Sequence, residues 1–301
     1  MSQAGVRRER LDALAIGLLI TCCALWGLNQ VAAKAALAEV PPLTQAALRS
    51  AGAALLVLCW AKARGIAVLE RDSTLRGGLL AGALFAAEFA CIFVGLQFTS
   101  ASRMVVFIYL APFIVALGMP LVSRGERLST LQWTGLATAF AGVAWAFAEA
   151  FSQTAAAPAR QWLGDALGVA AALFWGATTL AIRATPLSSA SAEKTLLYQL
   201  AVSGLLLALA APLAGESWPV RWSALSIGSL AFQTVIVTFA SYLTWFWLMR
   251  HYPATRISAF VLLSPVFGLA AGVGLLGEPL TLRLVLALAA VVVGLLLVNR
   301  R

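Results

Sequence analysis

Ten long apolar runs, separated by short polar or Pro/Gly-rich breaks, dominate the pattern of this chain. A helix needs about 20 mostly apolar residues to span a bilayer. The pattern therefore predicts ten membrane spans, near 12–35, 45–62, 76–97, 102–122, 129–149, 162–183, 193–212, 223–249, 255–276 and 282–299. No stretch between them is long enough for a soluble domain, and the stretch from Glu149 to Trp162 is typical of a flexible linker. We expect an all-α integral membrane protein.

The second half of the chain repeats short elements of the first half in the same order. The offsets are 149, 153 and 152 residues: Trp26-Gly27 returns as Trp175-Gly176, Ser102-Arg103 with Pro112 as Thr255-Arg256 with Pro265, and Gly125-Glu126 as Gly277-Glu278. Two units of five spans must lie in opposite orientations in the bilayer, because five is an odd number. The sequence therefore predicts two inverted five-helix repeats, at 1–150 and 151–301. Such inverted repeats are typical of secondary transporters, with a substrate site between the halves at the bilayer midplane.

Composition and charge agree with this class. Of 301 residues, 61% are hydrophobic and 11% are charged, which is far from the norm for a soluble domain. The net charge of +9 follows from topology: with an inner N-terminus, 15 of the 21 lysine and arginine residues fall on the inner side. That excess orients a multispan protein with this side in the cytoplasm. We expect both termini in the cytoplasm and no nucleic-acid partner.

Signals for catalysis are missing from the sequence. His251 is the only histidine and falls in a predicted cytoplasmic loop, so a metal site or a Ser-His pair would lack a partner. The sequence also has no glycine-rich loop of the kind that cradles phosphates. We expect no enzymatic activity, no cofactor and no bound metal.

Glu88 is the residue whose position would cost most in a bilayer. It lies near the middle of the third predicted span, and we expect no lysine or arginine at comparable depth in any other span. A deep ionisable group is rare and normally faces a cavity or a proton relay. The alternative is a protonated Glu88 that hydrogen-bonds to a neighbouring helix. The cavity is favoured, because deep carboxylates tend to be functional.

Four predicted spans carry polar or aromatic side chains at helical spacing. The candidate translocation path consists of Trp26, Asn29 and Gln30 in the first span, Glu88 in the third, Trp175, Thr178 and Thr179 in the sixth, and Thr238, Ser241 and Tyr242 in the eighth. Lipid would reject several of these groups, so their faces must turn inward. Interhelical hydrogen bonds would explain a single serine or threonine. The repeat-related pair Trp26 and Trp175 favours a path, because small-molecule sites combine aromatic walls with a few polar groups.

Pro112 and Pro265 form a second repeat-related pair, each inside a predicted span. Proline removes a backbone hydrogen bond and kinks a helix. One kink in each half would suit helices that bend to open one side and then the other, so both prolines are candidate hinges. A static kink is the alternative, because proline is common in membrane helices.

The doubled elements resemble the drug/metabolite transporter superfamily in its EamA-type branch, over Leu14 to Val298. This resemblance implies two inverted five-helix repeats around a central cavity and the export of amino acids and related metabolites. Within the branch, the chain looks most similar to aromatic amino-acid exporters of bacterial inner membranes. It departs from its own repeat at Pro279, where the first copy has Arg127.

We therefore predict an inner-membrane transporter that exports aromatic or other hydrophobic amino acids, or related metabolites, by alternating access. The aromatic residues of the path would stack on the ring of the substrate, Glu88 would pair with its ammonium group, and the amides or Thr179 would hold its carboxylate. Proton-coupled efflux of cationic drugs is an alternative, because the same residues would serve it. A second alternative is a lipid-handling membrane protein that does not transport amino acids. We expect a monomer whose partners are a small-molecule substrate and membrane lipid.

Overall fold

The computed structural model describes residues 12–122, 129–149, 160–217, 222–252, 260–261 and 263–299. Every regular element within these residues is a helix. In chain order they are α1 (Ala13–Ala36), α2 (Pro42–Ala63), α3 (Leu75–Gly95), α4 (Ala101–Ile108), α5 (Ala111–Val122), α6 (Thr130–Glu149), α7 (Gln161–Ala184), η1 (Pro186–Ser189), α8 (Ala192–Leu213), α9 (Ala224–Ala231), η2 (Phe232–Ser241), α10 (Tyr242–His251), α12 (Leu263–Leu276) and α13 (Leu282–Asn299).

Length and apolar composition mark much of the described chain as membrane-spanning. Seven stretches are long and apolar enough to cross a membrane: α1, α2, α3, Ala101–Val122, α7, α8 and Ala224–Leu248. Leu263–Leu276 and Leu282–Val298 are shorter apolar helices. Large apolar side chains also cover the outside; Leu121 and Leu213, for example, are each 88% exposed. An apolar exterior of this extent suits a multi-pass membrane protein, whereas the number of ten spans and their inversion stay predictions.

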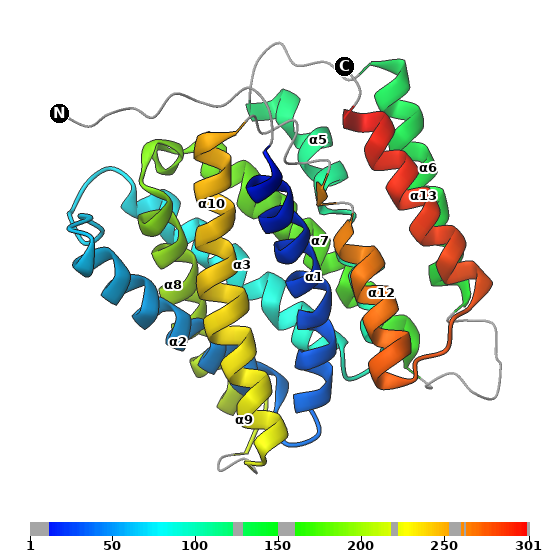
Figure 1. The fold of residues 1–301 in the computed structure, drawn as a ribbon, viewed down its shortest axis with the longest axis horizontal. Helices are drawn as coiled ribbons and strands as arrows, with labels where there is room; N and C mark the ends of the chain where they lie inside the picture. Colours follow the sequence, from blue (N-terminus) through cyan, green and yellow to red (C-terminus); the bar gives the residue numbers. More distant parts are fainter. Residues whose placement is uncertain are drawn as a thin grey trace.

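Helices of the first half pack against helices of the second half throughout the bundle. Figure 1 shows α6 and α13 side by side at one edge of the molecule, with α2 and α8 toward the opposite edge. Between these two pairs, α1 packs against α12 and against η2, and α3 packs against α7. The core is therefore shared between the two halves, and neither half buries its apolar surface on its own.

Glycines permit the closest of these contacts. A Cβ at Gly135 in α6 would lie 2.6 Å from the carbonyl oxygen of Gly294 in α13, so the two backbones touch directly. Small residues allow such approach between membrane helices. The doubled Trp-Gly element has the same use in each half: Gly27 of α1 lies against α12, and Gly176 of α7 lies against Ile114 of α5. This gives the repeated glycine a packing role.

The candidate hinge prolines lie where helices begin. α4 ends at Ile108 and α5 begins at Ala111, so the backbone breaks into a turn just before Pro112. Pro265 is the third residue of α12. Proline is well tolerated in the first turn of a helix, where its missing N–H needs no partner. Pro112 therefore follows a break between two short helices and does not kink a continuous helix. Its role as a hinge stays a prediction.

Carboxylates from the second half cap two helices of the first half. Glu216 accepts hydrogen bonds from the backbone N–H groups of Leu43 and Thr44 at 2.7 and 2.8 Å, at the start of α2. Glu278 does the same at the start of α4, where it accepts from the N–H groups of Ala101 and Ser102 at 2.6 and 2.9 Å. Negative groups satisfy the free N–H donors of a helix start and its positive dipole end. The second Gly-Glu element therefore holds the two halves together.

Candidate functional site

A fully buried arginine lies among the polar residues of the core. Arg49 of α2 is 0% exposed. Its guanidinium carbon lies 3.9 Å from the centroid of the Phe89 ring, and its Nε donates a hydrogen bond to Thr238 Oγ1 at 2.6 Å. Among the residues that the structure describes, Nη1 and Nη2 of Arg49 find no hydrogen-bond partner. Two of the three guanidinium nitrogens are thus left to bind something else.

The expectation that no lysine or arginine lies deep in a span is wrong. Its error lies in the start of the second span: α2 begins at Pro42, so Arg49 lies about two helical turns inside it. The pattern does contain a signal, because Gln45 and Arg49 lie four residues apart on one face of the helix, and both are buried. Sequence reasoning missed this stripe, although it found the stripes on four other spans.

Glu88 of α3 lies next to this arginine. Its side chain is in the protein interior, and the residue is only 6% exposed. Arg49 and Glu88 act on each other electrostatically without forming an ion pair within 4.0 Å. In the described part of the chain, Glu88 Oε2 also lacks a hydrogen-bond partner. A carboxylate and a guanidinium therefore lie near each other, each with polar atoms that the protein itself does not satisfy.

Aromatic side chains from both halves border this charged pair. Trp26 of α1 donates from Nε1 to Ser241 Oγ at 2.9 Å, and its ring lies 6.3 Å, centroid to centroid, from that of Tyr242. Tyr242 lies close to the Arg49 guanidinium and interacts with it as well as with Glu88, although no hydrogen bond within 3.5 Å joins it to Nη1 or Nη2. Ser241 and Tyr242 belong to the second half, so an aromatic wall joins the halves here. These contacts turn the three side chains toward neighbouring helices, and their place on a translocation path stays a prediction.

Trp175 continues the aromatic wall on the other side. Its ring lies edge-on to that of Tyr109, with centroids 5.7 Å apart. Tyr109 is buried in the turn before Pro112 and interacts electrostatically with Tyr242. The break in the helix thus places a tyrosine of the first half beside Trp175 of the second half. Sequence reasoning did not single out Tyr109, whose only signal is its position close to Pro112.

The other candidate residues divide into two groups. The hydroxyl groups of Thr178 and Thr179 donate to carbonyl oxygens of their own helix, at 2.8 and 3.1 Å. Such bonds satisfy a threonine within its helix and need no ligand. Asn29 and Gln30 are each 5% exposed, and their side-chain oxygens have no partner within the described ranges. The side-chain oxygens of the two amides of α1 can therefore still accept hydrogen bonds, whereas the hydroxyl groups of the two threonines already donate within their own helix.

Element η2 alters the face expected for the eighth span. It is a π-helix, whose turns are wider than those of an α-helix. Spacing for an α-helix predicts Thr238 and Ser241 on one face, but Thr238 contacts Arg49 of α2, whereas Ser241 contacts Trp26 of α1. The wider turns thus direct two neighbouring hydroxyls to two different helices. Segments of π-helix often occur at functional sites.

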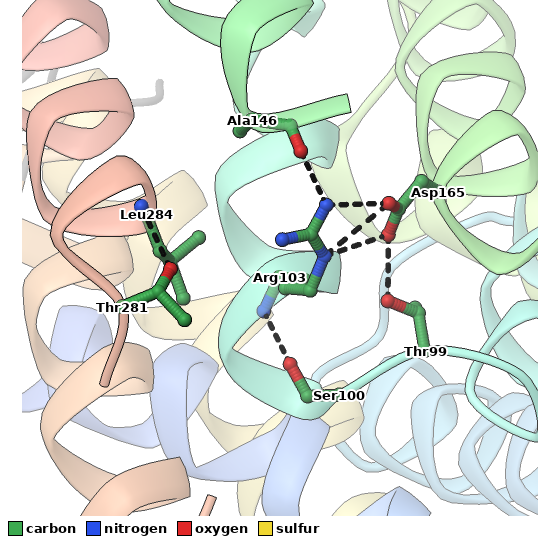
Figure 2. Close-up of polar contacts among 7 residues, drawn as sticks. All are labelled: Thr99, Ser100, Arg103, Ala146, Asp165, Thr281 and Leu284. Carbon is green, nitrogen blue, oxygen red and sulfur yellow. Dashed lines mark hydrogen bonds and ion pairs between the residues drawn. The ribbon is translucent and has the colours of Figure 1, made fainter. Parts of the chain in front are cut away.

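A second buried charge cluster ties the helix ends together. Figure 2 shows Arg103 of α4 facing Asp165 of α7. Arg103 Nη2 lies 2.6 Å from Asp165 Oδ2 and also donates to the carbonyl oxygen of Ala146 in α6 at 2.6 Å. Asp165 accepts a further hydrogen bond from Thr99 Oγ1 at 2.6 Å. The first Ser-Arg element thus has a structural role, which joins α4, α6 and α7.

Comparisons with known proteins agree with this architecture. The model of the EamA-like transporter family matches residues 13–148 and 162–300. The uncharacterized transporter YvbV of Bacillus subtilis (strain 168) is 27% identical over 288 residues, which cover 94% of this chain and 91% of that protein. The uncharacterized transporter YoaV of the same organism is 23% identical over 287 residues, covering 92% and 94%. A protein crystal structure shares the fold with a TM-score of 0.67 and 21% identity, over 95% of this chain and 96% of that one.

The two matched segments correspond to the two halves whose short elements recur in the sequence. Together they account for most of the chain, and they include the helices that carry Arg49, Glu88 and the aromatic wall. The expected resemblance to EamA-type proteins is thereby confirmed, and so is the broader prediction of a transporter. The chain belongs to the EamA-like transporter family.

Proposed function

We propose that this transporter exports aromatic or other hydrophobic amino acids, or related metabolites, from the cytoplasm. It lies in the inner membrane of a bacterium with both termini in the cytoplasm. Its ten spans form two inverted five-helix repeats, and the substrate binds between them near the midplane. The observation that carries this proposal is the aromatic wall contributed by both halves, of which Tyr242 interacts electrostatically with the buried Glu88.

The wall suits the side chain of an aromatic amino acid. Trp26, Tyr242, Tyr109 and Trp175 present large rings with a polar edge on some of them. Such rings gain from edge-on or offset contact with another ring, about 0.5–1.5 kcal/mol beyond the burial of area. Glu88 offers a carboxylate to the ammonium group of the substrate. A hydrophobic amino acid would thus find an apolar wall and a counter-charge in one place.

Alternating access would use the contacts between the two halves. In the proposed topology, the Glu278 cap and the Arg103–Asp165 pair both lie at the outer end of the bundle. Their closure favours a binding site that opens to the cytoplasm, and release outside would require these contacts to separate. The turn before Pro112 and the start of α12 at Pro265 are the proposed hinges.

The buried Arg49 weakens the alternative of cationic drug efflux. A cationic substrate would be drawn to Glu88 but repelled by the guanidinium beside it, and both effects are strong away from water. A substrate with one positive and one negative group suits both residues. The same pair offers nothing specific to the acyl chains of a lipid, so amino-acid transport is the better supported function.

The test is the uptake of labelled phenylalanine and tryptophan into proteoliposomes that contain the purified protein. Uptake is measured with and without an imposed pH gradient, against liposomes without protein. Flux without the gradient would establish a facilitator in which Glu88 binds substrate. Flux only with the gradient would indicate proton coupling, with Glu88 as the proton carrier. Absence of flux in both conditions would refute the proposal, and uptake of a labelled cationic drug or translocation of a labelled lipid would then replace it.

A further inference from the structure

We propose that Arg49 binds the carboxylate of the substrate, and that Arg49 and Glu88 together select molecules that carry a free carboxylate and a free ammonium group. This inference rests on the proposed amino-acid transport and assigns its selectivity to one pair of residues. The two residues come from neighbouring helices, α2 and α3, and both lie in the protein interior.

The guanidinium of Arg49 is held in a fixed position by its other contacts. Its central carbon lies over the Phe89 ring, 3.9 Å from the centroid, and its Nε donates a hydrogen bond to Thr238 Oγ1 at 2.6 Å. The only edge left for a ligand is therefore the one that carries Nη1 and Nη2. These two nitrogens match the two oxygens of a carboxylate, and paired hydrogen bonds of this kind are strong and directional.

Arg103, which is also buried, shows what a purely structural role of an arginine looks like. Arg103 gives its Nε to both oxygens of Asp165, and its Nη2 to Asp165 and to the carbonyl oxygen of Ala146. Arg49 is more deeply buried, yet its terminal nitrogens have no such partners in the described residues. A charged group without partners is costly at membrane depth, and charges retained there are generally functional. Arg49 therefore has the properties of a binding residue.

Glu88 supplies the second half of the recognition. It lies close enough to Arg49 to act on it electrostatically, but the two do not neutralise each other in a direct ion pair. Glu88 Oε2 has no partner among the described side chains and backbone groups. An ammonium group on Glu88 and a carboxylate on Arg49 would satisfy both residues at once. Tyr242 interacts with both residues and would therefore lie beside a substrate that is held between them.

The first experiment uses the unaltered protein and substrate analogues. Uptake of labelled phenylalanine into proteoliposomes is inhibited with unlabelled phenylalanine, with phenylalaninamide, which lacks the carboxylate, and with 3-phenylpropionate, which lacks the ammonium group. A hydrogen-bonded pair of charges that is lost in a buried site weakens binding by about 10- to 100-fold. We expect each analogue to inhibit with a half-maximal concentration about 10- to 100-fold above that of phenylalanine.

The second experiment tests whether Arg49 is the residue that binds the carboxylate of the substrate. Arg49→Gln should abolish the preference for phenylalanine over phenylalaninamide, so the ratio of their inhibition constants should approach one. Arg49→Lys keeps the charge but loses the paired donors, so the ratio should fall to an intermediate value. Arg76→Gln removes a comparable charge from the exposed start of α3 and should leave the ratio unchanged. Elution as a single monodisperse species shows which variants are folded.

The outcomes separate this inference from the proposed function. If phenylalanine is not transported at all, the proposed function fails and the inference fails with it. If phenylalanine is transported but phenylalaninamide inhibits equally well, the function stands and the role of Arg49 is wrong. Equal inhibition by 3-phenylpropionate would overturn the role of Glu88 alone. The analogue series uses the unaltered protein, so it decides the matter even if Arg49→Gln does not fold.

Discussion

The substitution Asp165→Asn removes a buried negative charge with almost no change in size. Asp165 is 0% exposed and Arg103 is 5% exposed, and their closest nitrogen and oxygen lie 2.6 Å apart. The carboxamide can still accept a hydrogen bond, but it leaves the guanidinium of Arg103 without its counter-charge in the interior. Removal of one partner of a buried ion pair costs about 3–5 kcal/mol. We expect Asp165→Asn to lower the free energy of unfolding by this amount.

The assay is the apparent melting temperature of the purified transporter in detergent, followed by size-exclusion chromatography after heating. At about 2.1 cal/mol/K of unfolding entropy per residue, 1 kcal/mol corresponds to about 1.6 °C for a chain of 301 residues, so the variant should melt about 5–8 °C below the unaltered protein. A matched control is Glu70→Gln, which removes a negative charge from an exposed residue between α2 and α3. The apparent melting temperature of the control should change by much less than that of Asp165→Asn.

A double substitution tests whether the stability at this site depends on the charges of the two side chains or on their packing volume. Arg103→Met together with Asp165→Leu removes both charges and keeps apolar volume at the site. Replacement of a buried ion pair by packed apolar residues is often neutral or stabilising. The double variant should therefore melt closer to the unaltered protein than either single variant does. An unchanged melting temperature in Asp165→Asn, or a double variant that loses the sum of the two single losses, would refute this reasoning.

Three further predictions concern other parts of the chain. Glu88→Gln should lower kcat/KM for phenylalanine by about 10- to 100-fold, because it removes the charge that pairs with the ammonium group, while expression stays normal; normal flux would make Glu88 structural. Trp175→Ala should weaken aromatic substrates about 2- to 10-fold more than leucine in the same uptake assay, because only the former lose ring contact; equal losses would argue against stacking. Asp72→Asn should lower the apparent melting temperature at pH 7 by no more than about 2 °C. Hydrogen bonds from Lys194 and then Thr74 lower the pKa of the Asp72 carboxyl to about 2, so its contribution is present above the unfolded pKa of about 4 and disappears as the pH falls through about 2. The two melting curves should converge on acidification from pH 4, and a difference that persists at pH 2 would contradict this assignment.

The helical elements were predictable because apolar length alone identifies a membrane span. The run that contains Glu88 is a helix from Leu75 to Gly95, close to the predicted 76–97. The inward direction of Trp26 and Tyr242 was also predictable, because lipid rejects their polar neighbours. These inferences need only local composition and helical spacing, both of which a single sequence displays.

Contacts between distant residues were not predictable in the same way. Nothing in the spacing indicates that Asp165 pairs with Arg103, or that Glu278 caps the helix that begins at Ala101, 177 residues earlier. Arg49 was missed for a different reason: its charge lowers the local hydropathy as at a span end, so the second span was placed to begin at 45, although α2 begins at Pro42 and Arg49 lies inside it. The π-helix of η2 is likewise invisible to a search that assumes α-helical spacing.

The caps donated by the second half have a consequence for the order of assembly. Glu216 lies 172 residues beyond Thr44, so α2 is translated long before its cap exists. During synthesis, the first helices therefore lack these caps until the segments that contain Glu216 and Glu278 have been inserted. Chains truncated before Glu278 should therefore be recognised by membrane quality-control proteases as incomplete, and full-length chains should escape once both caps are in place.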